Sequence, residues 1–340
     1  MLKGGRSLER AVSLRSGAQV QDALERLRHE VAVIDVGDDL VPMLKEAAPD
    51  VAFIALHGRD GEDGTVQELL EALDIPYTGS GPSGCVRCTD KALAKHLLRE
   101  AGLPTPDFYA FKERSIKEWD VASALPDVAR KLGFPMVVKP ASQGSALGVK
   151  FARSSKELPG AILGALSYDR KVVLERYVPG RDLAVSVLEV PPSSADGAQR
   201  VLEALPVVEA VPTEKDFYDF EARYEIGRTR FVCPAELPES LAERAKELAL
   251  ASYRVLGCEG VARVDLMLAH EDEEMQVLEA NVVPGLTETS LLPQAADAAG
   301  IGFDELVERI LASALARRER SGLAAVGAGP FSDFRSNTPE

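Results

Sequence analysis

The sequence has few of the side chains that bind soft metals. It contains four histidines and four cysteines among 340 residues, and only Cys85 and Cys88 have the CxxC spacing. No second CxxC and no His pair completes a zinc site around them. A redox-active pair is the alternative that this spacing leaves open. Ordinary reduced thiols are the expectation for a chain without an export signal.

Basic charge is also scarce, and long apolar runs are absent. The 39 Lys and Arg residues are outnumbered by 54 Asp and Glu, giving a net charge of −15, which disfavours a polyanionic nucleic-acid partner. No segment approaches the roughly 18 apolar residues of a membrane span. The first ten residues, MLKGGRSLER, lack the apolar core of a signal peptide. We therefore expect a cytoplasmic protein with neither a nucleic-acid nor a membrane partner.

The length and the first 80 residues predict several domains, the first of them α/β. A chain of 340 residues exceeds the roughly 250–300 at which single cores stop growing. Apolar strand patterns near 29–37 and 51–58 alternate with helix patterns, the first from Ser13 to Arg28, which predicts a doubly wound parallel sheet. Gly4 and Gly5 resemble the turn after a first strand. Only three residues precede them, so either that strand is short or the true start lies upstream.

The segment 261–290 contains two apolar runs, 261–268 and 275–281, around an acidic turn. This pattern predicts a β-hairpin. Because side chains two apart share a face of a strand, Arg263 groups with Asp265, and Glu279 groups with Asn281. If the two faces coincide, hard oxygen ligands meet without Cys or His, which suits Mg²⁺ and substrate phosphates. The alternative is a surface hairpin whose charges pair locally.

A second hairpin is predicted around a loop of small residues. The strand 136–140 carries Lys139, the loop 142–148 is rich in Gly, Ser and Ala, and the chain returns as a strand. Such a loop can close over phosphates with its backbone N–H groups. It is not a Walker A loop. Lys91 lies in the first turn of a helix, where it opposes the helix dipole, although an ordinary exposed lysine is the alternative.

Later segments predict further strands, helices and one unusual loop. The strand that begins at Lys171 ends in Glu175, Tyr177 and Val178, which could hold an adenine ring or form a plain edge strand. The runs 181–190 and 200–210 predict another hairpin. Residues 215–230 are aromatic and charged, as is typical of a functional loop. Helices are expected from Ser240, Ser290 and Phe303, and a disordered tail from 318.

With these motifs in order, the chain resembles the ATP-grasp ligases, and within them the D-alanine–D-alanine ligase family, from Gly4 to about Leu315. The resemblance rests on GGRSLERAVSLRSG, LHGRDGEDG, YTGSG, the Asp90-Lys91 pair, VVKPASQGSALGV, FYDFEARY, LGCEGVARVDLML and LEANVVPGLTETSLLP. It implies an N-terminal substrate-binding domain over 1–80, followed by the two lobes of the ATP-grasp fold, which has α+β character. The central lobe with its phosphate lid would span 81–180, and the C-terminal lobe 181–317.

The resemblance also implies the reaction and the site. Two D-alanines would be joined through an acyl phosphate, using ATP and two Mg²⁺ or Mn²⁺ ions, in a homodimer formed through the first domain. The implied metal ligands are Asp265, Glu279 and Asn281. The implied nucleotide-binding residues are Lys91, Lys139, Glu175, Tyr177, Val178, Asp182, Phe217 and Arg223. The implied catalytic residues are Glu9, Ser145, Tyr224, Arg263 and Ser290.

Several of these roles are specific. The resemblance implies that Glu9 binds the ammonium of the first D-alanine, and that Arg263 stabilises the acyl phosphate and the tetrahedral oxyanion. Ser290 and the backbone at Leu291 would take the second carboxylate. Glu9, Ser145 and Tyr224 would together lock the lid and the 215–230 loop over the site.

Two other functions stay open, and a few positions depart from the family. Ala11, Ala146, Arg223 and the pair Val282-Val283 replace residues that are more polar, or Lys, in the family. A D-alanine–D-lactate ligase is one alternative, which Tyr224 disfavours. A non-catalytic nucleotide-binding protein on the same scaffold is another, which the intact hairpin charges disfavour. The sequence does not name the base that deprotonates the second D-alanine.

Overall fold

A short parallel sheet forms the centre of the N-terminal part in the computed structural model, which describes residues 1–190, 201–212, 229–271 and 273–327. Strand β1 (Leu2–Lys3) pairs parallel with β2 (Ile34–Asp35). Parallel bridges join Leu2 to Ile54 and Ala52 to Tyr77, which extend the sheet to two further segments. The predicted α/β arrangement is confirmed, although the strands are shorter than the apolar runs that encode them.

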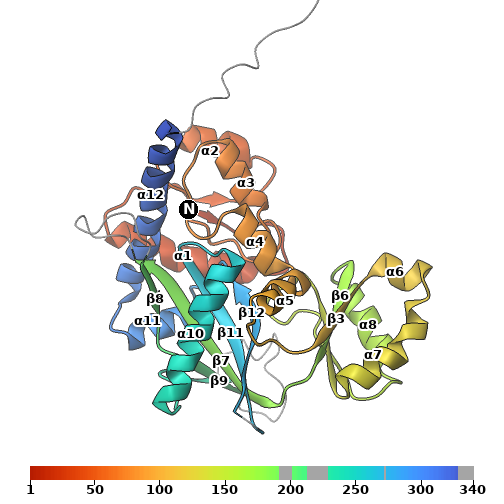
Figure 1. Ribbon diagram of the computed structural model, residues 1–340. Helices are drawn as coiled ribbons and strands as arrows, with labels where there is room; N and C mark the ends of the chain where they lie inside the picture. Colours follow the sequence, from red (N-terminus) through yellow and green to blue (C-terminus); the bar gives the residue numbers. More distant parts are fainter. Residues whose placement is uncertain (191–200, 213–228, 272, 328–340) are drawn as a thin grey trace, which may run out of the picture.

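Three helices accompany this sheet (Figure 1). They are α1 (Arg10–Arg26), α2 (Leu40–Ala47) and α3 (Thr65–Ala72). Helix α1 begins directly after Glu9, earlier than the predicted Ser13, and it buries Val12, Val20 and Leu24. The start of α1 therefore places Glu9 at the edge of the sheet where the glycine-rich turn lies.

The next two helices lead into a second sheet. They are α4 (Pro82–Thr89) and α5 (Lys91–Glu100). The run of Gly, Pro and Ser over 78–84 predicts a loop from the sequence. Pro82 instead begins a helix, because proline suits the first helical position after an extended residue such as Gly81. The antiparallel sheet has the order β3-β6-β4-β5. Its strands are β3 (Phe108–Lys112), β4 (Met136–Pro140), β5 (Lys150–Ala152) and β6 (Lys171–Arg176).

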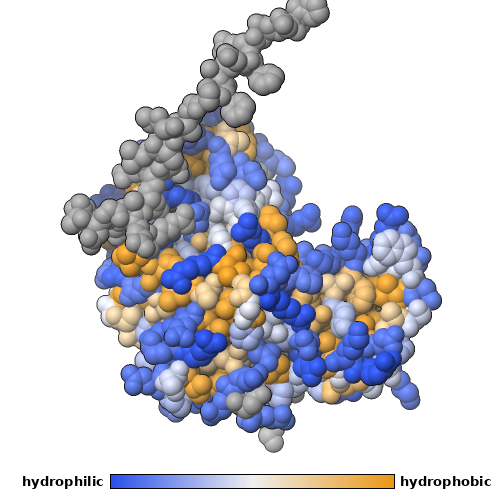
Figure 2. All heavy atoms as spheres, in the orientation of Figure 1, coloured by the Kyte–Doolittle hydropathy of each residue, from blue (hydrophilic) through white to orange (hydrophobic). Residues whose placement is uncertain are grey.

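This second sheet and the helices beside it form a separate lobe, the central lobe, on the right of Figure 1. Its helices are α6 (Glu113–Glu118), η1 (Val121–Ala124), α7 (Leu125–Leu132) and α8 (Leu158–Leu166). Met136, Val138 and Leu174 pack with Ile162 in a core of their own. The outline of the molecule is indented between the N-terminal domain and this lobe (Figure 2). The central lobe thus has its own hydrophobic core.

The C-terminal lobe is built on a larger antiparallel sheet with the order β10-β9-β7-β11-β12, with β8 also pairing with β7. Its strands are β7 (Gly180–Val190), β8 (Val201–Ala204), β9 (Val208–Pro212), β10 (Thr229–Val232), β11 (Val261–Ala269) and β12 (Met275–Asn281). The second strand of the hairpin predicted over 181–190 and 200–210 is divided in two. Pro206, which has no N–H to donate, lies at the division.

Helices cover this sheet and connect it to the N-terminal domain. They are α10 (Glu239–Leu256), α11 (Leu291–Ala298) and α12 (Phe303–Gly327). Helix α12 runs beside α1 (Figure 1). The tail predicted from residue 318 is therefore wrong in its first part, because the helix continues to Gly327. None of the helices in the described ranges is both long and apolar enough to cross a membrane.

The hairpin predicted from 261–281 is confirmed, and its register brings the two polar faces together. Arg263 lies opposite Asn281, and Asp265 lies opposite Glu279. The register then shifts between Asp265 and Leu266, because Leu266 pairs with Val277 and Leu278 is the extra residue. The four polar side chains therefore come together at one end of the hairpin, on a sheet whose other residues are mostly buried and apolar.

Candidate active site

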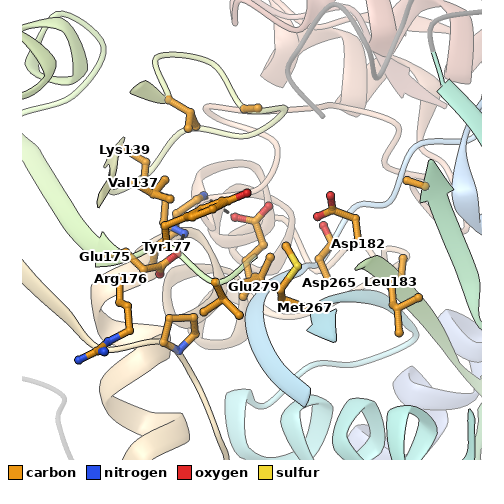
Figure 3. A pocket seen from close by; sticks show the side chains of 18 of the residues that line it. Val137, Lys139, Glu175, Arg176, Tyr177, Asp182, Leu183, Asp265, Met267 and Glu279 are labelled. Atoms are coloured by element: carbon orange, nitrogen blue, oxygen red, sulfur yellow. Dashed lines mark hydrogen bonds and ion pairs between the residues drawn. The ribbon is translucent and has the colours of Figure 1, made fainter. Parts of the chain in front are cut away.

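A cavity of about 980 Å³ lies between the central and C-terminal lobes. Lys139 and Glu175 reach it from the central lobe, and Asp182, Asp265 and Glu279 reach it from the other lobe (Figure 3). The cavity is therefore bounded by charged side chains of both lobes.

Most residues that the sequence predicts as nucleotide or metal ligands line this one cavity. They are Lys91, Lys139, Glu175, Tyr177, Val178, Asp182, Asp265 and Glu279. Apolar walls come from Val137, Met267 and Leu278. The ring of Tyr177 packs edge-on against Phe151 of β5, with centroids 5.6 Å apart. The cavity thus combines apolar walls with lysines and carboxylates, which is what a purine joined to phosphates requires.

Glu175 is held between two lysines. Its Oε1 accepts a hydrogen bond from Lys139 Nζ at 2.9 Å, and its Oε2 lies 2.5 Å from Lys95 Nζ. Burial raises the pKa of the Glu175 carboxyl, but the opposite effect of Lys139 and Lys95 is larger. The pKa is therefore below its ordinary value. Lys95 is not among the residues predicted from the sequence. Its position could have indicated a buried lysine, because Lys95 lies four residues after Lys91, on the helix face that also buries Leu98.

Lys91 connects the lid loop to the hairpin. Helix α5 begins here because the Asp90 side chain accepts the backbone N–H groups of Ala92 and Leu93 at 3.0 and 3.1 Å. The Lys91 ammonium donates to the carbonyl of Gln143 in the lid at 2.8 Å and lies 3.2 Å from Glu279 Oε2. This lysine is buried and faces the cavity, so the exposed alternative is wrong.

The hairpin carboxylates have cationic and amide partners. Arg263 donates from Nε and Nη2 to the two oxygens of Asp265 at 2.6 and 2.8 Å, and Asn281 Nδ2 donates to Asp265 Oδ2 at 3.2 Å. Among the described residues, no cluster of three His, Cys, Asp or Glu side chains is placed to hold a metal by itself. Two carboxylates and one amide are hard oxygen donors that fit Mg²⁺ when phosphate oxygens and waters complete the shell.

A second, more polar cavity of about 550 Å³ adjoins the first. Its lining includes the predicted residues Glu9, Ser145, Arg263, Asn281 and Ser290, together with His57 and Glu62. Leu291 lines both cavities. The hairpin therefore contributes to both, with Asp265 and Glu279 facing the first and Arg263 and Asn281 facing the second.

Glu9 is a buried carboxylate that contacts the lid. Ser145 donates a hydrogen bond to Glu9 Oε1, and a Cβ on Gly58 or Gly144 would come within 2.5 or 3.0 Å of Glu9 Oε2. The pKa of Glu9 is raised by burial and by Glu62, against the opposing effects of Ser145, His57 and Lys91. Ser145 has a φ of 52°, which is unusual for a residue with a side chain. The lid is thus held in a specific conformation against Glu9.

The buried side chains of His57 and Ser16 form a polar group with the half-buried Glu62, next to Glu9. His57 Nε2 lies 3.1 Å from Ser16 Oγ, and its Nδ1 lies 3.4 Å from Glu62 Oε1. Ser16 Oγ also accepts the backbone N–H of Leu286 at 3.2 Å, which ties α1 to the loop before α11. Neither Glu62 nor Ser16 is among the residues predicted from the sequence. The buried serine on the apolar face of α1 is the signal that could have revealed Ser16.

Ser290 is the N-cap residue of α11. Its Oγ accepts the Thr287 backbone N–H at 3.0 Å and lies 2.8 Å from Thr287 Oγ1. A Cβ on Gly285 would come within 2.5 Å of this hydroxyl, so only glycine leaves room for it. The helix start therefore places a hydroxyl and backbone N–H groups beside the polar cavity, where a carboxylate can bind. The predicted site residues Phe217, Arg223 and Tyr224 lie outside the described residues.

Comparisons with known proteins identify the family of this chain. A family model described as D-ala D-ala ligase C-terminus matches residues 97–312, and one described as D-ala D-ala ligase N-terminus matches 41–80. A D-alanine–D-alanine ligase of Syntrophotalea carbinolica is 43% identical over 94% of this chain and 96% of that protein. The crystal structure of D-alanine–D-alanine ligase from Bacillus anthracis superposes with a TM-score of 0.78 at 35% identity, covering 94% of this chain and 98% of that one. A structure of the B. anthracis ligase complexed with ATP gives a TM-score of 0.77, also at 35% identity, covering 94% of this chain and 97% of that one. The chain belongs to the D-alanine–D-alanine ligase family.

Proposed function

We propose that this chain joins two D-alanine molecules with the consumption of ATP, and so supplies the dipeptide for peptidoglycan precursors. The observation that carries this function is the pair of adjoining cavities. One has the lining that a nucleotide needs, and the other is small, polar and bounded by Glu9, Arg263 and Ser290. The β11–β12 hairpin contributes residues to both, which brings a phosphate donor and an amino acid to the same place.

The chemistry explains why these cavities adjoin. A carboxylate resists attack by an amine because its oxygen is a poor leaving group. Transfer of the γ-phosphoryl group of ATP to the first D-alanine carboxylate gives an acyl phosphate and ADP. The amine of the second D-alanine then attacks the carbonyl carbon, and phosphate leaves as the peptide bond forms. Phosphoryl transfer mainly requires positioning and neutralised charge, so a serine nucleophile is not needed.

We assign the larger cavity to ATP. Tyr177 and Val178 would contact the adenine beside Glu175, and Asp182 would bind the ribose. Lys91 and Lys139 would bind phosphate oxygens, and the 142–148 loop would close over them. Asp265, Glu279 and Asn281 would hold Mg²⁺ or Mn²⁺, with two ions per site, which would neutralise phosphate charge when bound. Phe217 and Arg223 are proposed nucleotide contacts from the loop outside the described residues.

We assign the smaller cavity to the two amino acids. Glu9 would pair with the ammonium of the first D-alanine, and Arg263 would stabilise the acyl phosphate and the oxyanion that follows. Ser290 and the backbone N–H of Leu291 would bind the second carboxylate. The hydrogen bond between Ser145 and Glu9 keeps the lid over this cavity, which protects an acyl phosphate from water. Tyr224 is the proposed third member of that contact.

The proposal extends to the setting of the reaction. A homodimer formed through the first domain is proposed. With a net charge of −15, no nucleic-acid partner is expected, and no membrane partner is proposed. A cytoplasmic location would place the enzyme where ATP is made.

The proposal is tested by measuring phosphate release from ATP with D-alanine, L-alanine or D-lactate offered separately, and by mass analysis of the products. D-Alanine alone is expected to stimulate release and to give the dipeptide. A mixture of D-alanine and D-lactate at neutral pH is expected to give the dipeptide and little depsipeptide. Absence of stimulation by D-alanine would contradict the substrate, and a predominant depsipeptide would favour the D-lactate alternative.

A further inference from the structure

Lys95 is a fully buried lysine outside both cavities. Its relative exposure is 0%. Lysine is almost never buried to this degree unless its ammonium is paired, because removing an ion from water is costly. The Lys95 ammonium lies 2.5 Å from Glu175 Oε2 and donates to Thr105 Oγ1 at 2.7 Å. An apolar side chain could fill this position without the cost of burying a charge, so the Lys95 ammonium suggests a role other than packing.

One of its partners belongs to the nucleotide cavity. Glu175 lines that cavity and accepts a hydrogen bond from Lys139, which lines it too. Lys95 contacts the other carboxylate oxygen of Glu175 and is not among the residues that line the cavity (Figure 3 shows Glu175 and Lys139). Burial lowers the pKa of Lys95 to about 8, opposed by the neighbouring Glu175. With a second cation on Glu175, Lys139 does not have to neutralise that carboxylate alone.

The other partner, Thr105, connects Lys95 to the C-terminal lobe. Thr105 donates its hydroxyl to the carbonyl of Val277 at 2.8 Å, and the N–H of Val277 donates to the carbonyl of Pro104 at 2.8 Å. Val277 lies in β12, two residues before Glu279 and next to the extra residue Leu278. The segment Pro104–Thr105 therefore binds both backbone groups of Val277, at the place where the strand changes register.

Together these contacts form one chain across the cavity wall. It runs from Lys139 to Glu175, Lys95, Thr105 and the carbonyl of Val277, and each link has a distance of 2.5–2.9 Å. One end is a lysine of the central lobe, and the other is the strand of the C-terminal lobe that carries Glu279. We propose that Lys95 is a positioning residue that sets the nucleotide cavity, holding Glu175 on one side and β12 on the other. This inference rests on the proposed function, because it assigns the cavity to ATP.

The test compares three variants. Lys95→Met keeps the length of the side chain and removes its charge. Thr105→Val is nearly isosteric and removes only the hydroxyl that joins Lys95 to Val277. Leu98→Ala is the matched control, because Leu98 is equally buried on the same helix and takes no part in the ion pairs. Affinity for a non-hydrolysable ATP analogue is measured by calorimetry, together with KM for ATP and for D-alanine.

We expect Lys95→Met to weaken nucleotide binding and to raise KM for ATP by about tenfold or more, with KM for D-alanine within about twofold of wild type. Thr105→Val should raise KM for ATP by about threefold. Leu98→Ala should lower the melting temperature but keep the nucleotide affinity within about twofold. A purely structural role for Lys95 would lower stability without this separation of the two KM values.

The proposal is overturned if folded Lys95→Met binds the nucleotide as wild type does, or if Leu98→Ala loses as much affinity. If Lys95→Met does not fold, Thr105→Val decides the matter, and unchanged affinity in that variant overturns the proposal. Assays of the wild-type enzyme distinguish failure of the proposed function from failure of the proposed role of Lys95. If it lacks D-alanine-dependent turnover, the proposed substrate fails, while calorimetry with the nucleotide still tests Lys95.

Discussion

Arg263 and Asp265, two residues apart on β11, form a two-point ion pair with N–O distances of 2.6 and 2.8 Å. The two groups have different proposed tasks, since the guanidinium faces the amino-acid cavity and the carboxylate faces the nucleotide cavity. The pair keeps both charges compensated inside a sheet of buried apolar residues. Binding of a metal ion with ATP would supply Asp265 with another cation and so make Arg263 available to substrate.

The first prediction concerns the shape of the Arg263 side chain. Arg263→Lys keeps the charge but loses the planar fork that contacts two oxygens at once. We expect kcat for D-alanine-dependent phosphate release to fall about 100-fold, with KM for ATP changed by less than about threefold. Steady-state kinetics on the purified variant measure this. Wild-type kcat would contradict the role of the fork.

Arg181→Lys is the matched control for that variant. Arg181 forms a comparable two-point pair with Glu209 in the same sheet, at 2.7 and 2.6 Å, but does not line either cavity. Its replacement should leave kcat within about twofold of wild type, because an ion pair at this partly exposed position contributes little by itself. Equal losses in both variants would point to a general effect on the sheet.

The second prediction concerns metal binding. Because the proposed ligands Asp265, Glu279 and Asn281 supply only part of a Mg²⁺ shell, a divalent ion needs phosphate oxygens and waters to complete it. Mg²⁺ alone should therefore raise the melting temperature by less than about 1 °C, and Mg²⁺ with a non-hydrolysable ATP analogue by about 3 °C or more. Asp265→Asn should lose the part of the shift that depends on Mg²⁺.

Thermal denaturation with and without a chelator provides the comparison. Chelation should reduce the shift caused by the analogue in wild type and have little effect in Asp265→Asn. A large shift with Mg²⁺ alone would mean that the chain holds the ion without nucleotide. A shift in Asp265→Asn equal to that of wild type would remove Asp265 from the ligand set.

The hairpin shows how much of the site the sequence contains. Alternation of side chains groups Arg263 with Asp265 on one strand and Glu279 with Asn281 on the other, but does not show that the two faces coincide. Counting from the turn without the extra residue Leu278 would place Val264, not Asp265, opposite Glu279. The register shift is therefore what brings the four side chains to one face. The doubly wound first domain follows from alternating strand and helix patterns, and the ATP-grasp lobes are implied by the family resemblance. The fold comparison agrees.

The features that the sequence could not supply depend on distant contacts. Lys95 and Glu175 are 80 positions apart on different elements, and no local pattern shows that a helix lysine meets a strand glutamate. The same holds for Ser16, whose partners His57 and Leu286 come from opposite ends of the chain. Errors at element ends have a different cause. Pro82 is a helix start that resembles a loop, and α12 continues beyond the last strong apolar repeat.

The third prediction concerns the pH dependence of stability and Glu9. Burial and the neighbouring Glu62 raise the pKa of Glu9 in the folded chain above the unfolded value of 4.5. The stability that Glu9 contributes is therefore fully present below that unfolded pKa and is lost as the pH rises through the folded pKa. Glu9→Gln resembles the protonated form at every pH. We expect the variant to be more stable than wild type near neutral pH.

Urea denaturation at about pH 7.5 and about pH 5 tests this sign. The advantage of Glu9→Gln should shrink at the lower pH, while its D-alanine-dependent activity should be lost at both if Glu9 binds the ammonium group. Glu46→Gln, at an exposed position on α2, is the control and should change stability little. A variant that is less stable than wild type at neutral pH would show that the carboxylate stabilises the fold after all.

The fourth prediction concerns the lid and Gly148. This glycine has a φ of +75°, and a Cβ would lie 2.6 Å from Tyr168 Cδ2 and 2.8 Å from Pro140 Cγ. Alanine there combines a backbone penalty of about 1–2 kcal/mol with a clash, so the loop must move away from Tyr168. That loop also presents the Gln143 carbonyl to Lys91, and Gln143 Nε2 donates to the carbonyl of Tyr168. We expect Gly148→Ala to raise KM for ATP about tenfold.

Gly160→Ala gives the comparison that separates lid placement from the general effect of adding a methyl group. Gly160 lies in α8, and a Cβ at this position would have no atom within 4 Å, so alanine there should stabilise the chain by about 0.5–1 kcal/mol and leave KM for ATP unchanged. Steady-state kinetics and urea denaturation on both variants provide the measurements. Because the clash requires the loop to move, a wild-type KM in Gly148→Ala would mean that the position of this loop does not affect ATP binding, and its assignment as the phosphate lid would fail.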